Sequence, residues 1–120
     1  MSPTHTLLVK QKFAFDKIQS IPEAKKDKYK SFIENFGLMV YNNGLINALT
    51  FAKAKRDEHD VYTHISAWLQ NPNFLWSFSN PDENDLIANV LTVDSLRLLV
   101  LTQEVISFSD ILKAFAKAEL

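Results

Sequence analysis

The strongest constraint on the fold is a series of apolar residues near the C-terminus, separated by alternating steps of three and four. The series consists of Leu98, Leu101, Val105, Phe108, Leu112 and Phe115. Because an α-helix repeats every 3.6 residues, this spacing places all of these side chains on one helical face. It predicts a helix over about residues 93–117. Clusters of β-branched residues are few and never alternate with a period of two, so the sequence predicts no β-sheet.

The N-terminal part of the chain predicts two more helices. The first covers about residues 4–19, and its inward face consists of Leu8, Phe15 and Ile18. Ser20 and Glu23, with Pro22 in the first turn, have the spacing of a capping box and predict the start of the second helix. The apolar face of that helix consists of Tyr29, Phe32, Ile33, Phe36 and Val40.

Gly44 predicts a joint between the second helix and a third. Glycine permits backbone angles that other residues avoid, and the chain has only two glycines. Asn42 and Asn43, just before the joint, are short polar residues that can cap a helix. The other glycine, Gly37, lies inside the second helix and predicts close helix packing or a bend there. The third helix covers about residues 45–55, and its inward face consists of Leu45, Ala48, Leu49 and Ala52.

The remaining segments complete an all-α fold. A fourth helix follows the acidic turn at residues 57–60, and one side of it consists of Val61, Ile65, Trp68 and Leu69. The aromatic and apolar residues expected to hold down a loop over residues 71–82 are Phe74, Leu75, Trp76 and Phe78. A helix start at residues 80–83 opens a short fifth helix that ends near residue 91. We therefore expect a compact, single-domain bundle of about five to six helices over residues 1–120.

The composition narrows the class of protein. With 120 residues, 47% hydrophobic and 22% charged, the chain is typical of a soluble globular domain. The absence of cysteine excludes disulfide bonds and thiolate metal sites. No apolar run approaches the ~20 residues of a membrane span, and the N-terminus lacks the long apolar core of a signal peptide. We expect a cytoplasmic protein.

The net charge of −1 is unevenly distributed along the chain. Residues 1–56 have ten lysines and arginines against four acidic residues, whereas residues 57–120 have three against ten. Such asymmetry favours an anionic partner for the first half. An alternative stays open here: both halves form solvated faces, since halves of a sequence need not be halves of a structure.

A catalytic or metal site is difficult to build from this sequence. His59 and His64 are five residues apart, whereas a zinc pair on a helix needs a spacing of four. A metal-dependent hydrolase using both histidines with Asp60 is therefore the weakest hypothesis, and two surface imidazoles are favoured. Two glycines cannot form a glycine-rich phosphate loop, and Glu104 is expected to be a satisfied helix carboxylate. The sequence predicts a protein that is not an enzyme and uses no metal or cofactor.

Two clusters of basic residues form the candidate binding site. The cluster at the start of the second helix consists of Lys25, Lys26, Lys28 and Lys30, and the one at the end of the third consists of Lys53, Lys55 and Arg56. If the two helices run antiparallel, up to seven positive charges meet at one end of the hairpin, a footprint suited to phosphates. A solubilising surface is the alternative for any one lysine. Tyr29 and Tyr41 are expected in the core rather than as stacking surfaces for bases.

Several motifs resemble those of a known family. They are Asn43-Gly44-Leu45 followed by Leu49, Phe51 and Lys55, the segment from His64 to Trp68-Leu69, and Thr102, Glu104, Leu112, Lys113, Phe115 and Ala116. In order and spacing over about residues 29–118, they resemble the small helical subunit of the Cmr complex, the type III-B CRISPR effector that targets RNA with a guide RNA. Lys113 is retained, whereas Ala114 replaces an arginine common in the family.

The resemblance implies a non-catalytic, structural subunit of a ribonucleoprotein that acts in antiviral defence. Copies of such a subunit stack head to tail into an inner filament, beside the backbone and large subunits, and stabilise the guide RNA and target RNA. The expected RNA-binding residues are the two basic clusters and Lys113. A helical protein–protein adaptor without a nucleic-acid role is the alternative, with the charge asymmetry serving self-association.

Overall fold

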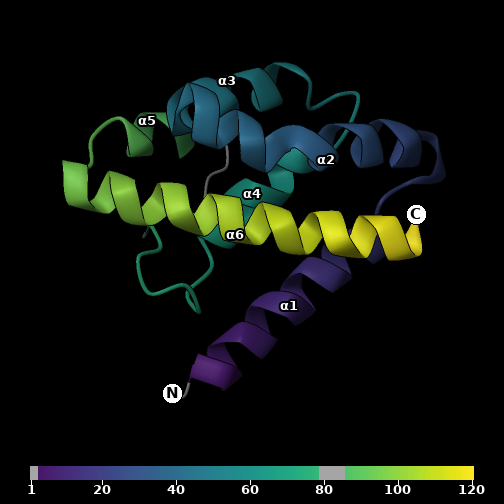
Figure 1. Cartoon of the computed structure of the whole chain (residues 1–120), viewed down its shortest axis with the longest axis horizontal. Helices are drawn as coiled ribbons and strands as arrows, with labels where there is room; N and C mark the ends of the chain where they lie inside the picture. Colours follow the sequence, from purple (N-terminus) through teal and green to yellow (C-terminus); the bar gives the residue numbers. More distant parts are fainter. Residues whose placement is uncertain (1–2, 79–85) are drawn as a thin grey trace.

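A computed structural model describes residues 3–78 and 86–120 of the chain (Figure 1). Within these ranges the chain forms six α-helices and one 3₁₀ turn, and no strand occurs there. The elements are α1 (Pro3–Gln19), η1 (Glu23–Lys25), α2 (Lys26–Asn43), α3 (Leu45–Ala54), α4 (Val61–Leu69), α5 (Leu86–Val90) and α6 (Ser95–Glu119). The all-α prediction is confirmed. Of the helices described, none is both long and apolar enough to cross a membrane.

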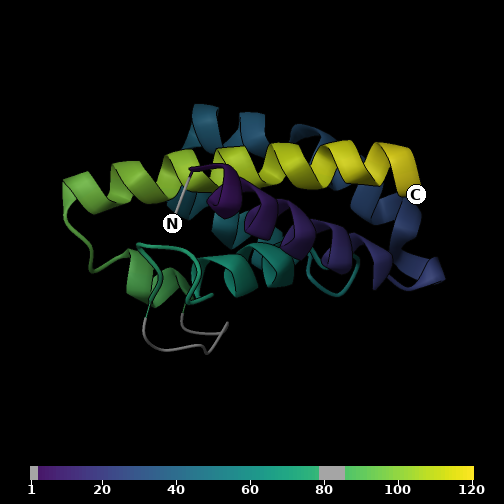
Figure 2. The ribbon, with the colours of Figure 1, turned by 90° about the horizontal axis from the view of Figure 1, so that it is seen from below.

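The long helix α6 is the element against which α1, α2 and α4 pack. Figure 1 shows α6 lying lengthwise, with α2 along one side and α1 crossing it, and Figure 2 shows α4 and α5 in a neighbouring layer. Asp94 caps α6 by accepting a 2.8 Å hydrogen bond from the Arg97 amide. Of the predicted apolar series, Leu98 is 37% exposed and Phe115 is half-buried. The residues of α6 that are buried are Leu101, Val105, Phe108, Ser109, Leu112 and Ala116.

The first helix buries less of its length than the sequence predicts. Ile18 is buried with Ala14, and Phe15 is half-buried, but Leu8 is 59% exposed. The inward position expected for Leu8 is therefore wrong. The reason is the crossing geometry: Figure 1 shows the first turns of α1 extending away from the other helices.

The capping box expected at the start of the second helix is not formed. The Ser20 hydroxyl instead donates a 2.7 Å hydrogen bond back to the Lys17 carbonyl. Glu23 begins η1, and among the described residues no side chain caps either η1 or α2 with a hydrogen bond. The Glu23 carboxylate pairs with Lys26 at 2.9 Å. An extra 3₁₀ turn thus shifts the start of α2 away from Ser20, and this explains why the prediction fails.

Gly44 forms the predicted joint. Its φ of 87° lies in the region that disfavours side chains, and its amide donates to the Val40 carbonyl at 2.9 Å, which ends α2. Its own carbonyl accepts from the Ala48 amide at 3.1 Å, which begins α3. Gly44 itself occupies the N-cap position of α3, so the caps expected from Asn42 and Asn43 are wrong.

Gly37 confirms the expected close packing of the second helix. A Cβ at this position would lie 3.4 Å from Asp110 Oδ1 and 3.9 Å from Ser109 Cβ. Both of these atoms belong to α6, so the backbone of α2 approaches α6 closely here. Of the inward face predicted for α2, Tyr29, Ile33, Phe36 and Val40 are buried in the core, and Phe32 is half-buried against it.

The inward faces predicted for α3 and α4 are also buried. In the loop after α4, only some of the predicted anchor residues are buried. Phe74 and Phe78 are buried, whereas Trp76 is 37% exposed and Leu75 is 91% exposed, so the anchoring role expected of Leu75 is wrong. Arg97 holds this loop to α6: its guanidinium donates to the carbonyl oxygens of Trp76 (3.0 Å) and Ser77 (3.3 Å). The predicted helix start at residues 80–83 lies outside the described residues.

The core residues of α3 and α4 are Leu45, Ala48, Leu49, Ala52, Val61, Tyr62, Ile65, Trp68 and Leu69.

Candidate nucleic-acid interface

The two basic clusters lie at the same end of the α2–α3 hairpin. Glu58, in the turn after α3, is 4.0 Å from the Lys28 ammonium and 3.9 Å from the Lys55 ammonium. A single carboxylate can approach both only if the start of α2 and the end of α3 are neighbours. We call this region, with its seven cations, the basic end; they are Lys25, Lys26, Lys28, Lys30, Lys53, Lys55 and Arg56.

Carboxylates neutralise much of the basic end, which the sequence alone does not predict. Lys25 pairs with Asp60 at 3.1 Å, in addition to the contacts of Glu58 and of Glu23. Residues 23–30 and 53–60 together have seven cations and five acidic residues. In the sequence, the acidic turn at residues 57–60 indicates only a helix start, although it directly follows Arg56. Folding places it between the two clusters.

The two ion pairs of Glu58, with Lys28 and with Lys55, are long and exposed enough to exchange the carboxylate for another anion. Lys28 and Glu58 remain 68% and 48% exposed as side chains, and Lys55 remains 45% exposed. Exposed pairs of this kind contribute about 0–1 kcal/mol each, because water and salt screen them. The cations paired with Glu58 therefore remain accessible to phosphate.

The other candidate cations differ in their surroundings. Lys30 is exposed on α2, whereas the Lys53 ammonium lies 6.0 Å from the centre of the Tyr62 ring. Arg56 is half-buried. Lys113 lies outside the basic end: it lines a groove between α2 and α6 that also contains Glu34 and Asp110. The contacts of Glu58 and Asp60 thus connect Lys25, Lys28 and Lys55 of the two clusters, whereas Lys113 lies outside the basic end.

His59 is buried at the basic end and is not the surface imidazole that we expected. Its side chain is 2% exposed, and its ring stacks on Phe32 with centroids 4.1 Å apart. Its Nδ1 accepts a 3.3 Å hydrogen bond from the Val61 amide, and its Nε2 has no hydrogen-bond partner among the described residues. Burial lowers the pKa of His59 from its usual value, so the neutral ring is favoured.

His64 is buried too, which makes the second expected surface imidazole wrong. It is 4% exposed, and its Nδ1 lies 2.8 Å from the Tyr29 hydroxyl. Burial lowers the pKa of His64 to about 4 and raises that of Tyr29 well above its usual value. Tyr29 is a core residue, as predicted. Within residues 3–78 and 86–120, no group of three or more potential ligands is placed to hold a metal ion.

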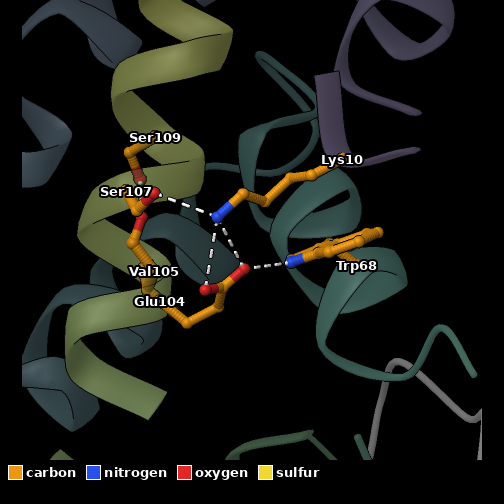
Figure 3. A network of polar contacts seen from close by, with 6 residues as sticks. All are labelled: Lys10, Trp68, Glu104, Val105, Ser107 and Ser109. Carbon is orange, nitrogen blue, oxygen red and sulfur yellow. Dashed lines mark hydrogen bonds and ion pairs between the residues drawn. The ribbon is translucent and has the colours of Figure 1, made fainter. Parts of the chain in front are cut away.

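Glu104 is the satisfied helix carboxylate expected from the sequence, as Figure 3 shows. The Lys10 ammonium is 3.2 Å from its Oε2 and donates a 3.0 Å hydrogen bond to the Ser107 hydroxyl. Trp68 Nε1 donates to the same carboxylate oxygen at 2.6 Å. These contacts join α1, α4 and α6 beside a cavity of about 520 Å³ that is also lined by the residues 72–75. The arrangement is a structural cross-link.

Tyr41 differs from the core position predicted for it, since it is 77% exposed. It stands between two grooves, one of about 410 Å³ and one of about 330 Å³, and lines both. The helical spacing of apolar residues in α2 ends with Val40, and Tyr41 falls one position beyond the buried face. This offset is the signal in the sequence that places Tyr41 on the surface.

The fold and its surface define a small all-α protein with cations gathered at one end. Comparison with known families gives the identity more closely: the family described as CRISPR-associated protein (Cas_Cmr5) matches residues 9–119. The chain belongs to this family and is a CRISPR-associated small subunit of the Cmr, or type III-B, class. The resemblance drawn from the sequence motifs is thereby confirmed. No curated protein and no solved structure matches the chain.

Proposed function

We propose that the protein is a non-catalytic structural subunit of a cytoplasmic CRISPR ribonucleoprotein and contacts RNA through the basic end. The observation that carries the proposal is the position of Glu58, within 4.0 Å of both Lys28 and Lys55. It means that cations from two separate segments form one surface. A surface of this kind binds the sugar–phosphate backbone without regard to base sequence. This suits a subunit that must accept any guide RNA and target RNA.

The mechanism is an exchange of ion-pair partners. Phosphate oxygens replace the carboxylate of Glu58 on Lys28 and Lys55, and counterions are released from the RNA. Because the existing pairs are exposed and weak, their loss costs about 0–1 kcal/mol each.

Contacts with other copies of the chain complete the proposal. Head-to-tail stacking uses two different surfaces on each copy. The basic end is one, and the α2–α6 groove with Glu34 and Asp110 is a suitable second, since both carboxylate residues are exposed there. Stacked copies share phosphate contacts along the RNA, so a weak contact per copy gives a stable array together with the backbone and large subunits.

The test is a charge reversal within the assembled complex. Lys55→Glu with Arg56→Glu should weaken incorporation or RNA retention and lower the salt dependence of RNA binding, because phosphate contacts are lost. Lys12→Glu with Lys117→Glu is the matched control, since it makes the same change in net charge at exposed positions outside the basic end. Unchanged assembly and RNA retention in the first variant would refute the placement of the interface.

The second candidate is a protein–protein adaptor that does not contact RNA. The five carboxylates among the seven cations of the basic end support it, since a mixed surface also suits a charged protein partner. Nuclease treatment separates the two functions. Assemblies that survive it, and that contain no RNA after purification, would favour the adaptor.

A further inference from the structure

A cluster of three aromatic rings lies beside the basic end, where α2 and α3 pack together (Figure 1). The rings of Phe51 and Phe32 are nearly parallel, with 10° between their planes and 5.9 Å between their centroids. The ring of His59 stacks on Phe32 in turn, at 4.1 Å. His59 is buried and Phe32 is half-buried, whereas Phe51 is 47% exposed. Because Phe51 packs on Phe32 at one side, the cluster supports an aromatic ring whose other side is open to solvent.

The exposed ring lies about one helical turn from the two lysines that Glu58 contacts. Phe32 follows Lys28 by four positions in α2, and Lys55 follows Phe51 by four positions at the C-cap of α3. Side chains four positions apart on a helix are neighbours, with Cβ atoms about 5–6 Å apart. Since Glu58 connects the two lysines and the rings stack on each other, the lysine pair and the ring pair form adjacent rows across the hairpin.

The surroundings of Phe51 are polar, which distinguishes it from the centre of a protein interface. Of the large apolar residues in α3, only Phe51 is exposed. The exposed residues around it on this helix and its cap are Asn47, Thr50, Ala54 and Lys55. A protein-binding site is typically a contiguous apolar patch, and a single ring does not form one. A ring beside accessible cations instead suits a ligand that is anionic and also has an aromatic face. RNA has both, since each nucleotide joins a phosphate to a base through its sugar.

We propose that Phe51 stacks on an unpaired RNA base while the neighbouring phosphates bind Lys28 and Lys55. The inference rests on the proposed function and adds the kind of RNA segment that the basic end binds. Stacking does not depend on base sequence, because every base has an aromatic face. A base inside a continuous duplex is already stacked between its neighbours, whereas a base in a single strand can turn toward a protein ring. The basic end therefore binds a single-stranded segment in preference to the interior of a duplex.

The test compares two labelled RNAs that differ only in their bases. One is a single strand of mixed sequence, and the other has the same length and the same phosphates but abasic spacers in place of its bases. Fluorescence anisotropy at low salt measures the affinity of the full chain for each. Phe51→Leu keeps an apolar side chain on Phe32 but removes the ring, so it should bind the first RNA about fivefold or more weakly and the second unchanged. Phe51→Tyr keeps the ring and should bind both RNAs as the unmodified chain does.

Trp76→Leu is the matched control, since it removes a partly exposed ring from the loop after α4, outside the basic end. It should bind both RNAs as the unmodified chain does, and the thermal midpoint of each variant will verify that the fold is retained. Equal affinity of Phe51→Leu and the unmodified chain for the first RNA would overturn the inference. Equal losses of Phe51→Leu on both RNAs would overturn it too, because a loss that does not need the base is not a loss of stacking.

Lys55→Glu with Arg56→Glu separates a failure of this inference from a failure of the proposed function. This variant should bind both RNAs more weakly, since both have the phosphates. If it loses affinity and Phe51→Leu does not, only the inference fails. If neither variant loses affinity, the proposed function fails as well.

Photocross-linking in the assembled complex decides the question if the isolated chain binds too weakly for anisotropy. Iodouridine in the RNA forms a covalent bond on irradiation with an aromatic side chain that stacks on it, and mass spectrometry identifies the residue. A cross-link at Phe51 is expected, and its absence would overturn the inference. Sedimentation tests the other occupant of the ring: a dimer of the isolated chain that Phe51→Leu dissociates, with RNA affinity unchanged, would show that a second copy covers Phe51 and would overturn the inference.

Discussion

Trp68 Nε1 and Glu104 Oε2 are joined by a 2.6 Å hydrogen bond across 36 positions of the chain. Lys10 pairs with the same carboxylate, and the side chains of Lys10 and Glu104 are only 13% and 17% exposed. One carboxylate thus connects α1, α4 and α6. Because two donors depend on it, the residue is a structural requirement of the fold.

Removal of the Glu104 carboxylate should therefore destabilise the protein. Glu104→Ala leaves the Trp68 N–H without its acceptor and the Lys10 ammonium with only the Ser107 hydroxyl, and we expect the free energy of unfolding to fall by about 2–4 kcal/mol. Glu104→Gln keeps an acceptor for Trp68 and should cost less. Urea denaturation at pH 7 measures both. Equal stability of the alanine variant and the unmodified protein would contradict this role of Glu104.

Acidification should destabilise the fold through His64. Burial lowers its pKa to about 4, with Asp60 opposing the shift and Lys17 adding to it. The unfolded chain takes up this proton near pH 6.5 and the folded chain only near pH 4. Stability is thus complete above pH 6.5 and decreases as the pH falls from 6.5 to 4, by up to about 3 kcal/mol. Buried His59 should act in the same direction, since its pKa is also lowered.

His64→Asn isolates this contribution, because an amide can still hydrogen-bond the Tyr29 hydroxyl but does not titrate. Urea denaturation at several pH values between 7 and 4 should show a shallower pH dependence for the variant than for the unmodified protein. Identical slopes would mean that His64 does not titrate differently in the folded and unfolded states.

The two glycines should respond to alanine in opposite directions. At Gly44 the space is open, since a Cβ there would meet none of the described residues within 4 Å, but the φ of 87° disfavours any side chain. Gly44→Ala should therefore cost about 1–3 kcal/mol through backbone strain. At Gly37 the helix is regular and a Cβ meets Asp110 at ordinary van der Waals distance. Gly37→Ala should stabilise the protein by up to about 1 kcal/mol. Thermal or urea unfolding measures both variants.

Neutralising Glu58 should strengthen RNA binding, if the basic end is the RNA interface as proposed. Glu58→Gln removes the carboxylate that competes for Lys28 and Lys55. We expect several-fold tighter binding at low salt and a steeper salt dependence. Fluorescence anisotropy of labelled RNA measures the affinity, in the complex if the isolated chain binds too weakly.

The control for this measurement is Glu119→Gln, which makes the same change in net charge at the exposed end of α6. It should leave the affinity nearly unchanged. If both variants bind RNA equally well, the effect belongs to net charge and not to the basic end.

Local sequence determined the helices because their causes are local. The apolar spacing from Leu98 to Phe115 predicted α6, and the need for a positive φ between two helices predicted the joint at Gly44. The same periodicity predicted the buried faces of α2, α3 and α4. It failed at Leu8, because periodicity gives the face of a helix but not how far along its length a neighbour covers that face.

Tertiary structure alone decided which side chains meet. Lys10 pairs with a carboxylate 94 positions away, and the Tyr29 hydroxyl meets His64 across 35 positions. It also placed Glu58 between two lysine clusters, so a surface that the sequence predicts to be basic is mixed. These contacts depend on the angles at which helices cross, and those angles follow from how complete side-chain surfaces pack together. The sequence determined the helices and their inward faces, whereas helix packing determined the chemistry of the surface.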